Sequence, residues 1–261
     1  MTSTSSSSLQ IGGSTLAYNC VGDGPAVVVV HGIGGHKEDW AGLAQVLAAE
    51  HSVYTTDLLG FGESSKSGEV ITIADQVAAI IALLDAENVA KADIVGNSLG
   101  GWVAATLAAT YPDRVNRLIL VDAAGFKAMF EGKPPVNFYP TTVAEMSNLL
   151  DHVRFDPATH TDAFAIQALA ASMAAGDAQA SAAVGQGMFV SERLEEVADR
   201  ISAPTLVIWG AEDKLFPAGI ADLVTGHIQG SRKVLIPNAS HFPQLDNAVA
   251  FNAVVVEFLQ R

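Results

Sequence analysis

A short serine segment flanked by glycines is the part of this chain whose residue types most directly suggest chemistry. Residues 96–100 read Gly-Asn-Ser-Leu-Gly, between the apolar pair Ile94-Val95 and the helix-like segment 101–109. A G-x-S-x-G between a strand and a helix forms a turn so tight that its flanking positions leave almost no room for side chains. The turn presents the hydroxyl of Ser98 at the end of the strand, where the N–H of Leu99 also points. The pattern favours a nucleophilic serine over an ordinary serine in a glycine-rich turn.

An acid and a base follow this serine along the chain. Asp213 comes just after the buried-strand run 204–210, and His241 comes after the next strand run. A serine hydroxyl is a weak nucleophile, so it needs a base within hydrogen-bond reach. A buried carboxylate holds the imidazole of such a base in the required tautomer. We therefore predict Ser98 as the nucleophile, His241 as the general base and then the general acid, and Asp213 as the acid that orients it.

A second glycine-rich turn lies upstream of the serine. Four consecutive valines, residues 27–30, lead into His-Gly-Ile-Gly-Gly at residues 31–35. Backbone N–H groups at such a turn stabilise negative charge that develops on an attacked carbonyl oxygen. We expect the N–H groups of Ile33 and Leu99 to form this oxyanion hole, with Gly34 as the alternative to Ile33.

With these segments together, the chain resembles the α/β-hydrolase superfamily from about Leu9 to its C-terminus. The order serine, aspartate, histidine is the order of that family's catalytic triad. Two further segments match: residues 57–64, Asp-Leu-Leu-Gly-Phe-Gly-Glu-Ser, after an early strand, and residues 118–122 after the helix that follows the serine.

The resemblance also implies roles for neighbouring residues. It implies that His31 supports the oxyanion loop, and that Asp122 is the alternative to Asp213, because some relatives carry the acid after the preceding strand. Ser98, where two branches carry aspartate, argues against epoxide hydrolases and haloalkane dehalogenases. Ser240 departs from the glycine that commonly precedes the histidine, and would either add a hydroxyl near the site or tighten the turn.

The predicted elements form an α/β pattern. Alternating strands and helices predict a doubly wound, mostly parallel sheet with helices on both faces. We assign residues 9–124 and 201–261 to this core, residues 1–8 to a flexible polar tail, and residues 125–200, which lack strand runs, to an inserted helical cap. Expected strands are 9–11, 15–19, 26–30, 53–56, 93–95, 117–121, 205–209 and 233–236. Expected helices are 40–49, 73–85, 99–110, 143–150, 163–174, 191–200, 218–225 and 248–259.

The predicted cap is rich in large apolar side chains. Most of them are expected to pack the cap onto the core, and a minority to line an apolar pocket above the serine. Phe130 and Phe189 are the predicted pocket residues from the cap, with Phe242 beside the histidine. Arg154 and Arg193 are the candidates for contact with a substrate carboxylate.

Composition narrows the function classes. The chain has 261 residues, a formal net charge of −14 and one cysteine, Cys20. The negative charge disfavours nucleic acid and anionic membranes as partners, and the single cysteine suits a reducing compartment. We predict a cytoplasmic enzyme, a monomer or homodimer, whose partner is a small-molecule substrate. The scattered histidines and the lack of a dinucleotide-binding motif predict neither a metal nor another cofactor.

These features predict a cofactor-independent serine hydrolase that cleaves an ester-like bond of a small, partly apolar substrate through an acyl-enzyme on Ser98. The leading alternative is a carbon–carbon bond hydrolase of the meta-cleavage-product type. Such relatives usually carry a cap arginine and a tryptophan after the catalytic histidine, where this chain has Phe242. An enol-lactonase, an amide hydrolase and a non-catalytic ligand receptor with the same fold are further alternatives.

Overall fold

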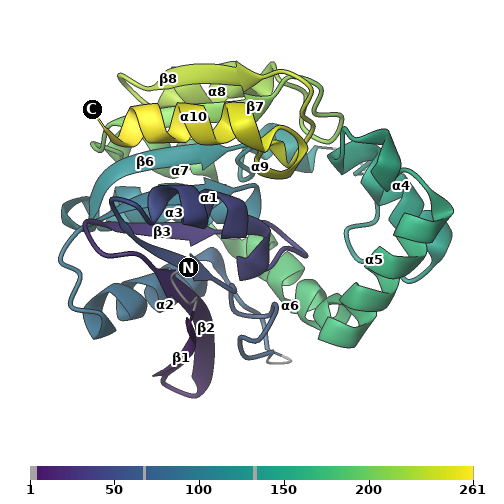
Figure 1. The fold of residues 1–261 in the computed structure, drawn as a ribbon, viewed down its shortest axis with the longest axis horizontal. Coiled ribbons are helices and arrows are strands. Elements are labelled where there is room, and N and C mark those ends of the chain that lie inside the picture. Colours follow the sequence, from purple (N-terminus) through teal and green to yellow (C-terminus); the bar gives the residue numbers. More distant parts are fainter. Residues whose placement is uncertain (1–4, 67–68, 132–133, 261) are drawn as a thin grey trace.

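The protein is built on one mixed sheet. The computed structural model describes residues 5–66, 69–131 and 134–260, and within them eight strands form a sheet in the order β1-β2-β4-β3-β5-β6-β7-β8 (Figure 1). The pairs β1·β2 and β2·β4 are antiparallel and the other five are parallel. The predicted mostly parallel α/β sheet is confirmed. The strands are β1 Ser5–Ile11, β2 Ser14–Val21, β3 Ala26–Val30, β4 Ser52–Thr56, β5 Ala92–Asn97, β6 Val115–Val121, β7 Thr205–Gly210 and β8 Arg232–Ile236.

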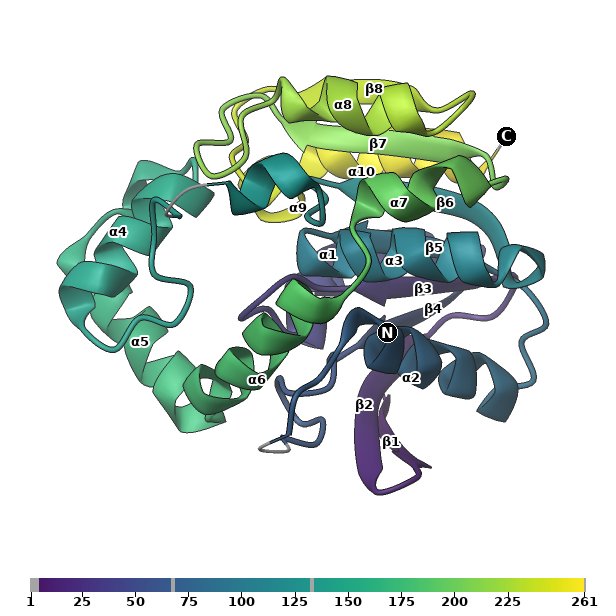
Figure 2. The ribbon, with the colours of Figure 1, turned by 180° about the vertical axis from the view of Figure 1, so that it is seen from behind.

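Helices cover both faces of this sheet (Figures 1 and 2). Successive strand residues point to opposite faces, so Val28 and Val30 of β3 join one hydrophobic cluster and Val27 and Val29 join the other. The first cluster includes side chains of α2, α3 and α8, and the second those of α1 and α10. The α-helices are α1 Ala41–Leu47, α2 Ile73–Ala86, α3 Leu99–Thr110, α4 Val143–Val153, α5 Asp162–Ala175, α6 Asp177–Val190, α7 Leu194–Val197, α8 Ile220–His227, α9 Pro243–Asp246 and α10 Ala248–Leu259.

The regular secondary structure described between β6 and β7 consists of helices joined by loops. We call residues 125–200 the helical insertion; it forms an arc beside the sheet in Figures 1 and 2. It contains α4 to α7 and three short 3₁₀ helices, Lys127–Phe130, Pro157–Thr159 and Ala198–Arg200. Helix α4 begins at a capping box in which Thr142 and Glu145 each accept the other's backbone N–H, a pairing that satisfies donors left free at a helix start.

The prediction of a flexible tail over residues 1–8 is wrong for residues 5–8; residues 1–4 lie outside the described residues. Ser5 to Ser8 form the first half of β1 and pair with β2 from Cys20 to Ala17. Strand pairing uses backbone N–H and C=O groups, so a run of serines can extend an edge strand without contributing apolar side chains.

Helix α6 was not predicted, because Gly185 and Gly187 lower helix propensity. Gly187 instead allows close packing: a Cβ placed there would lie 1.8 Å from the carbonyl oxygen of Ile71, in the segment before α2. The glycine therefore brings the helical insertion against the core. Within the described residues, no helix is both long and apolar enough to span a membrane.

Candidate active site

Ser98 lies at the turn between β5 and α3. Its backbone has φ 54° and ψ −117°, a conformation in which a residue with a side chain is strained. A Cβ on Gly96 would lie 2.1 Å from the carbonyl oxygen of Gly100, and one on Gly100 would lie 2.4 Å from that of Val30. The two glycines of the motif are therefore needed for α3 to pass so close to the strands. Ser98 donates its N–H to the carbonyl of Val121, at 2.9 Å.

His241 and Asp213 form a buried hydrogen-bonded pair. Asp213 follows the end of β7, His241 follows β8, and Nδ1 of His241 lies 2.8 Å from Oδ2 of Asp213. The other oxygen, Oδ1, accepts the N–H groups of Leu215 at 2.8 Å and Phe216 at 2.9 Å. Because a carboxylate only accepts, Nδ1 carries the proton and Nε2 presents its lone pair. The imidazole is therefore in the tautomer that a general base requires.

The Nε2 atom of His241 has no hydrogen-bond partner among the described residues, although His241 is only 2% exposed. The hydroxyl of Ser98 lines the same cavity, and the hydrogen bond between the two is not formed in this structure. Catalytic hydrogen bonds are often long in unliganded enzymes and tighten when substrate binds. The arrangement can thus remove a proton from Ser98 once the two side chains come within hydrogen-bond distance.

Two side chains hold the His241 loop in place, and neither contact was predicted. Asn97 donates from Nδ2 to the carbonyls of Val121, at 3.2 Å, and His241, at 3.1 Å. Ser240 donates its hydroxyl to the carbonyl of His152 in α4, at 2.9 Å. The serine in place of glycine therefore links the loop to the helical insertion. The position of Asn97 inside the serine motif was the one sequence signal available for its role.

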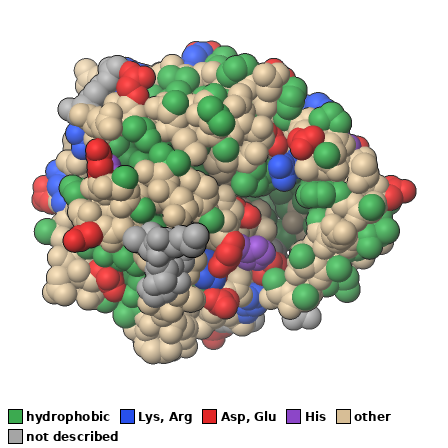
Figure 3. Space-filling model, in the orientation of Figure 1, with side chains coloured by type: hydrophobic (Ala, Val, Ile, Leu, Met, Phe, Trp, Pro, Cys, Tyr) green, Lys and Arg blue, Asp and Glu red, His purple; other side chains and the backbone are tan. Residues whose placement is uncertain are grey.

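A cavity of about 290 Å³ opens onto Ser98 and His241. Figure 3 shows the surface hollowed between the helical insertion and the rest of the molecule. Ile33, Gly34 and Phe242 lie in its wall, whereas Leu99 does not and is fully buried; the role predicted for Leu99 involves only its N–H, at the start of α3. The insertion contributes Phe138, Pro140, Met146, Leu149, Leu150, Val153, Arg154, Phe164, Ala168, Ala171 and Ser172.

The prediction that Phe130 and Phe189 line this cavity is wrong. Phe130 packs against Trp102 at 5.7 Å between ring centroids and against Phe189 at 6.0 Å, and Phe189 is 69% exposed. The guanidinium of Arg193 lies 4.1 Å from the centre of the Phe130 ring. These residues attach the end of the insertion to α3 and are not part of the cavity wall.

Two side chains of the cavity wall, Arg154 and His36, are each paired with a carboxylate. Arg154 donates from Nε to Asp246 at 2.9 Å, and His36 Nε2 lies 2.8 Å from Asp177 Oδ2, at the start of α6. The hydrogen bond with Asp177 raises the pKa of His36 above its ordinary value, against the opposing effect of burial. Both pairs connect the helical insertion to the core beside the cavity.

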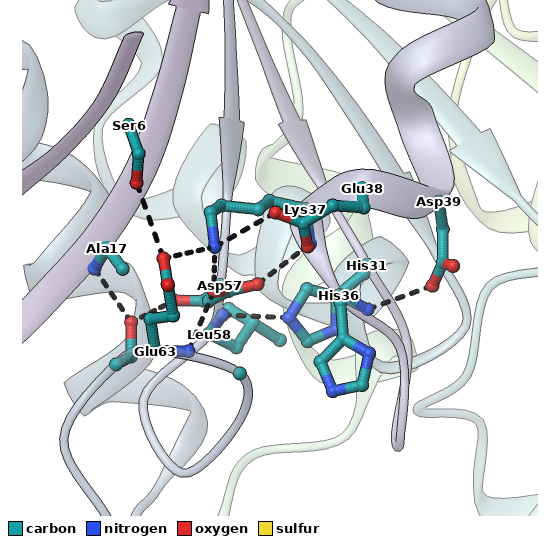
Figure 4. Close-up of polar contacts among 12 residues, drawn as sticks. Ser6, Ala17, His31, His36, Lys37, Glu38, Asp39, Asp57, Leu58 and Glu63 are labelled. Carbon is teal, nitrogen blue, oxygen red and sulfur yellow. Dashed lines mark hydrogen bonds and ion pairs between the residues drawn. The ribbon is translucent and has the colours of Figure 1, made fainter. Parts of the chain in front are cut away.

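His31 links the predicted oxyanion loop to the segment that follows β4, and Figure 4 shows its contact with Leu58. Its Nδ1 lies 2.6 Å from the carbonyl oxygen of Gly32, and its Nε2 accepts the N–H of Leu58 at 2.9 Å. An acceptor at Nε2 leaves the proton on Nδ1, so the ring is neutral. Burial lowers the pKa of His31, which favours the same neutral form.

A buried ion pair anchors the end of this loop. Lys37 Nζ lies 2.8 Å from Asp57 Oδ2 and 2.8 Å from Glu63 Oε2 (Figure 4). Asp57 also accepts the N–H groups of Lys37, at 2.7 Å, and Glu63, at 2.9 Å. Burial alone would raise the pKa of Asp57, but the hydrogen bonds from Lys37 and Glu63 outweigh it and lower that pKa.

Replacing Lys37 with methionine is expected to lower the free energy of unfolding by about 3 kcal/mol, because the buried Asp57 loses its cation. Urea unfolding at pH 7 measures this change. Since the pKa of folded Asp57 is lowered, the stabilisation is present above about pH 4, the ordinary carboxyl pKa, and is lost as the pH falls through the folded-state value. Exposed Lys91→Met is the control, with a change of about 0.5 kcal/mol or less. Equal stability of the Lys37 variant and the wild type would contradict the prediction.

Asp122, the alternative acid, lies close to Asp213 and His241, but its carboxyl group is hydrogen-bonded elsewhere. Its Oδ1 accepts the N–H of Gly210 at 2.9 Å, and no hydrogen bond between Asp122 and His241 is formed among the described residues. One donor atom each of Asp122, Asp213 and His241 lies within 4.8 Å of the others. Of the two acids, Asp213 is the one hydrogen-bonded to Nδ1 of His241.

Known proteins with the same fold are similar to this chain. The family described as alpha/beta hydrolase fold matches residues 25–248. The chain is 32% identical over 252 residues to a 2-hydroxymuconate semialdehyde hydrolase from Pseudomonas sp. (strain CF600), covering 91% of this chain and 88% of that protein. It is 29% identical over 264 residues to a pimeloyl-[acyl-carrier protein] methyl ester esterase from Aeromonas hydrophila subsp. hydrophila, covering 91% and 96%.

The solved structure of a meta-cleavage product hydrolase from Pseudomonas fluorescens IP01 matches with a TM-score of 0.86 at 27% identity, covering 97% of each chain. This similarity in structure extends over nearly the whole length of both chains. Because the family match spans most of the sequence, the chain belongs to the alpha/beta hydrolase fold family and is a hydrolase.

Proposed function

We propose that this protein is a serine hydrolase that cleaves an ester-like bond of a small, partly apolar substrate. One observation carries the proposal: a buried imidazole, held at Nδ1 by Asp213, has its Nε2 without a partner among the described residues, in the cavity that Ser98 lines. An imidazole oriented in this way is a base, and the serine is the hydroxyl within its reach.

The proposed cycle has two halves. In the first, Nε2 of His241 takes the proton of Ser98 while Oγ attacks the substrate carbonyl. The N–H groups of Leu99 and Ile33 then stabilise the negative charge on the carbonyl oxygen. The imidazolium returns its proton to the departing alcohol, and the acyl group remains on Oγ. In the second half, His241 deprotonates a water molecule that attacks the acyl-enzyme, and the acid leaves with Ser98 restored.

The cavity supports the proposed substrate class. Its volume of about 290 Å³ suits a small molecule, and most of the side chains that line it are apolar. Helices α4 and α5 form the wall opposite Ser98, so we propose that the helical insertion, residues 125–200, acts as a cap that selects the substrate. Pocket walls of this kind discriminate by about 1–3 kcal/mol per methylene group.

A carbon–carbon bond hydrolase is the second candidate. Two observations favour it: the 32% identity to a 2-hydroxymuconate semialdehyde hydrolase, and the position of Arg154 in the cavity wall, where a cation can contact a substrate carboxylate. The pairing of Arg154 with Asp246 reduces the charge available for that contact, and Phe242 stands where tryptophan follows the histidine in such relatives.

Turnover of a graded substrate panel tests the proposal. Esters of increasing acyl length, lactones and vinylogous diketones are compared by kcat/KM, with Ser98→Ala as the inactive control. We expect turnover of short-chain esters, with a burst of released alcohol if the acyl-enzyme accumulates. Turnover of diketones without turnover of esters would replace the first candidate with the second. Turnover of none would contradict both.

A further inference from the structure

A second buried carboxyl group lies beside the acid–base pair and takes no part in the cycle described above. Asp122 follows the end of β6 and is fully buried. Its Oδ1 accepts the N–H of Gly210 at 2.9 Å. Its Oδ2 is buried and has no hydrogen-bond partner among the described residues. Asp122, Asp213 and His241 each place one atom within 4.8 Å of the other two.

Two carboxyl groups this close together, and out of water, are not both ionised, because like charges in a buried site repel strongly. The charge belongs on the group that receives more donors. Asp213 accepts three hydrogen bonds, from His241, Leu215 and Phe216, whereas Asp122 accepts one, from Gly210. The proton shared by the two acids therefore resides on Asp122.

The electrostatic surroundings agree with this assignment. Burial and the negative charge of Asp213 raise the pKa of Asp122 well above its ordinary value, and the charge of Asp246 adds to this effect. The charged groups that act on Asp122 are thus Asp213 and Asp246, and the titratable imidazole of His241 lies beside them. Arg154 is paired with Asp246 at 2.9 Å and so offsets the acid whose charge has the smaller effect on Asp122.

The backbone of Asp122 also has an unusual conformation, with a positive φ. Its φ is 43°, in the left-handed region that costs a residue with a side chain about 1 kcal/mol or more and that recurs at active sites. The hydrogen bond from its N–H to the carbonyl of Ile208, at 3.0 Å, and the bond from Gly210 hold this conformation. The turn places the carboxyl group close to Asp213, which follows the neighbouring strand β7.

We propose that Asp122 is a positioning residue: a neutral carboxylic acid whose Oδ2–H donates a hydrogen bond to the carboxylate of Asp213. This proposal rests on the proposed serine mechanism. The bond holds Asp213 against His241 and leaves a single negative charge beside the imidazole. One negative charge balances the imidazolium that forms when Ser98 loses its proton. Two negative charges would favour the imidazolium form of His241 before the substrate is attacked.

Infrared difference spectroscopy tests the protonation state without any turnover. Spectra are recorded at pH 7 for Ser98→Ala and for Ser98→Ala/Asp122→Asn, with and without carbon-13 label in the aspartate carboxyl groups. We expect the second substitution to remove an isotope-sensitive C=O band of a protonated carboxyl group. Asp85→Asn, at an exposed ion pair with Arg114, is the matched control and should remove carboxylate bands only. Loss of carboxylate bands alone in the Asp122 variant would overturn the proposal.

Kinetics tests the positioning role. Asparagine at 122 keeps an acceptor for Gly210 and a donor for Asp213, so Asp122→Asn should change kcat by about threefold or less. Leucine offers neither, so Asp122→Leu should lower kcat by about tenfold to a hundredfold with little change in KM. The acid limb of the kcat/KM profile should stay in place in the asparagine variant, because no charge is removed.

A move of that limb to lower pH in Asp122→Asn would show that Asp122 is ionised in the wild type and would overturn the proposal. Equal kcat values for the leucine and asparagine variants would also overturn it. If Asp122→Leu does not fold, the asparagine profile and the infrared result decide. If the protein turns over no substrate in the panel, the proposed function fails, and the infrared result alone decides whether Asp122 is neutral.

Discussion

Replacing Ser98 with alanine is expected to lower kcat by at least about 10⁴-fold, because the attacking oxygen is removed while only binding and charge stabilisation remain. The fold should persist: alanine is smaller than serine, and no hydrogen bond of the Ser98 hydroxyl is formed among the described residues. Steady-state kinetics on the best substrate of the panel measures the loss, and thermal unfolding checks the fold. A fluorophosphonate probe should label the wild type at Ser98, as identified by peptide mass spectrometry.

Ser172→Ala is the matched control, because Ser172 is a second hydroxyl in the wall of the same cavity. Its removal should leave labelling of Ser98 intact and change kcat/KM by a few-fold at most. Retained activity in a folded Ser98→Ala protein, or labelling at another residue, would contradict the nucleophile assignment.

Replacing Asp213 with asparagine should lower kcat by about 10⁴-fold. The amide group introduced by Asp213→Asn can donate to Nδ1 of His241, which moves the ring proton to Nε2. That atom can then no longer accept the proton of Ser98, and the imidazolium loses its negative partner. The kcat of the variant is measured at several pH values, because a simple shift in the protonation of His241 would be reversed by a change in pH, whereas the wrong tautomer would not.

Two acidic residues near Asp213, Glu212 and Asp122, serve as comparisons for it. Exposed Glu212, which accepts the N–H of Ala239 at 3.1 Å, should tolerate glutamine with little loss of kcat. Asp122→Asn should also cost far less than Asp213→Asn. The reverse ranking of the two asparagine variants would move the role of orienting acid to Asp122.

Prediction and structure agree closely for segments whose local sequence is apolar and which are buried in the structure. The predicted helices 99–110 and 248–259 have the observed bounds of α3 and α10, and the predicted strand 26–30, with valine at residues 27–30, is the buried β3. The strand was predictable because a parallel strand that is covered on both faces has a continuous apolar sequence. The glycines beside Ser98 were equally predictable, since they leave no room for a side chain.

Prediction failed where contacts between distant segments decide the outcome. Phe130 and Phe189 have the composition of pocket residues, yet they pack with Trp102 and Arg193 because α6 and α7 return to α3. The serines of β1 have the composition of a flexible tail, but in the structure they pair with β2. In both cases the deciding partner lies far away in the chain, and neither periodicity nor propensity contains that information.

By itself, the sequence determined the α/β sheet, the strained serine turn and the chain order of nucleophile, acid and base, because these depend on local apolar runs, on glycine and on the ends of strands. Only the tertiary structure decided which acid bonds His241, which side chains line the cavity and how Asn97 and Ser240 hold the histidine loop. It alone also brought Asp122 beside Asp213, because charge and protonation in a buried cluster depend on distances between strands that the sequence does not specify.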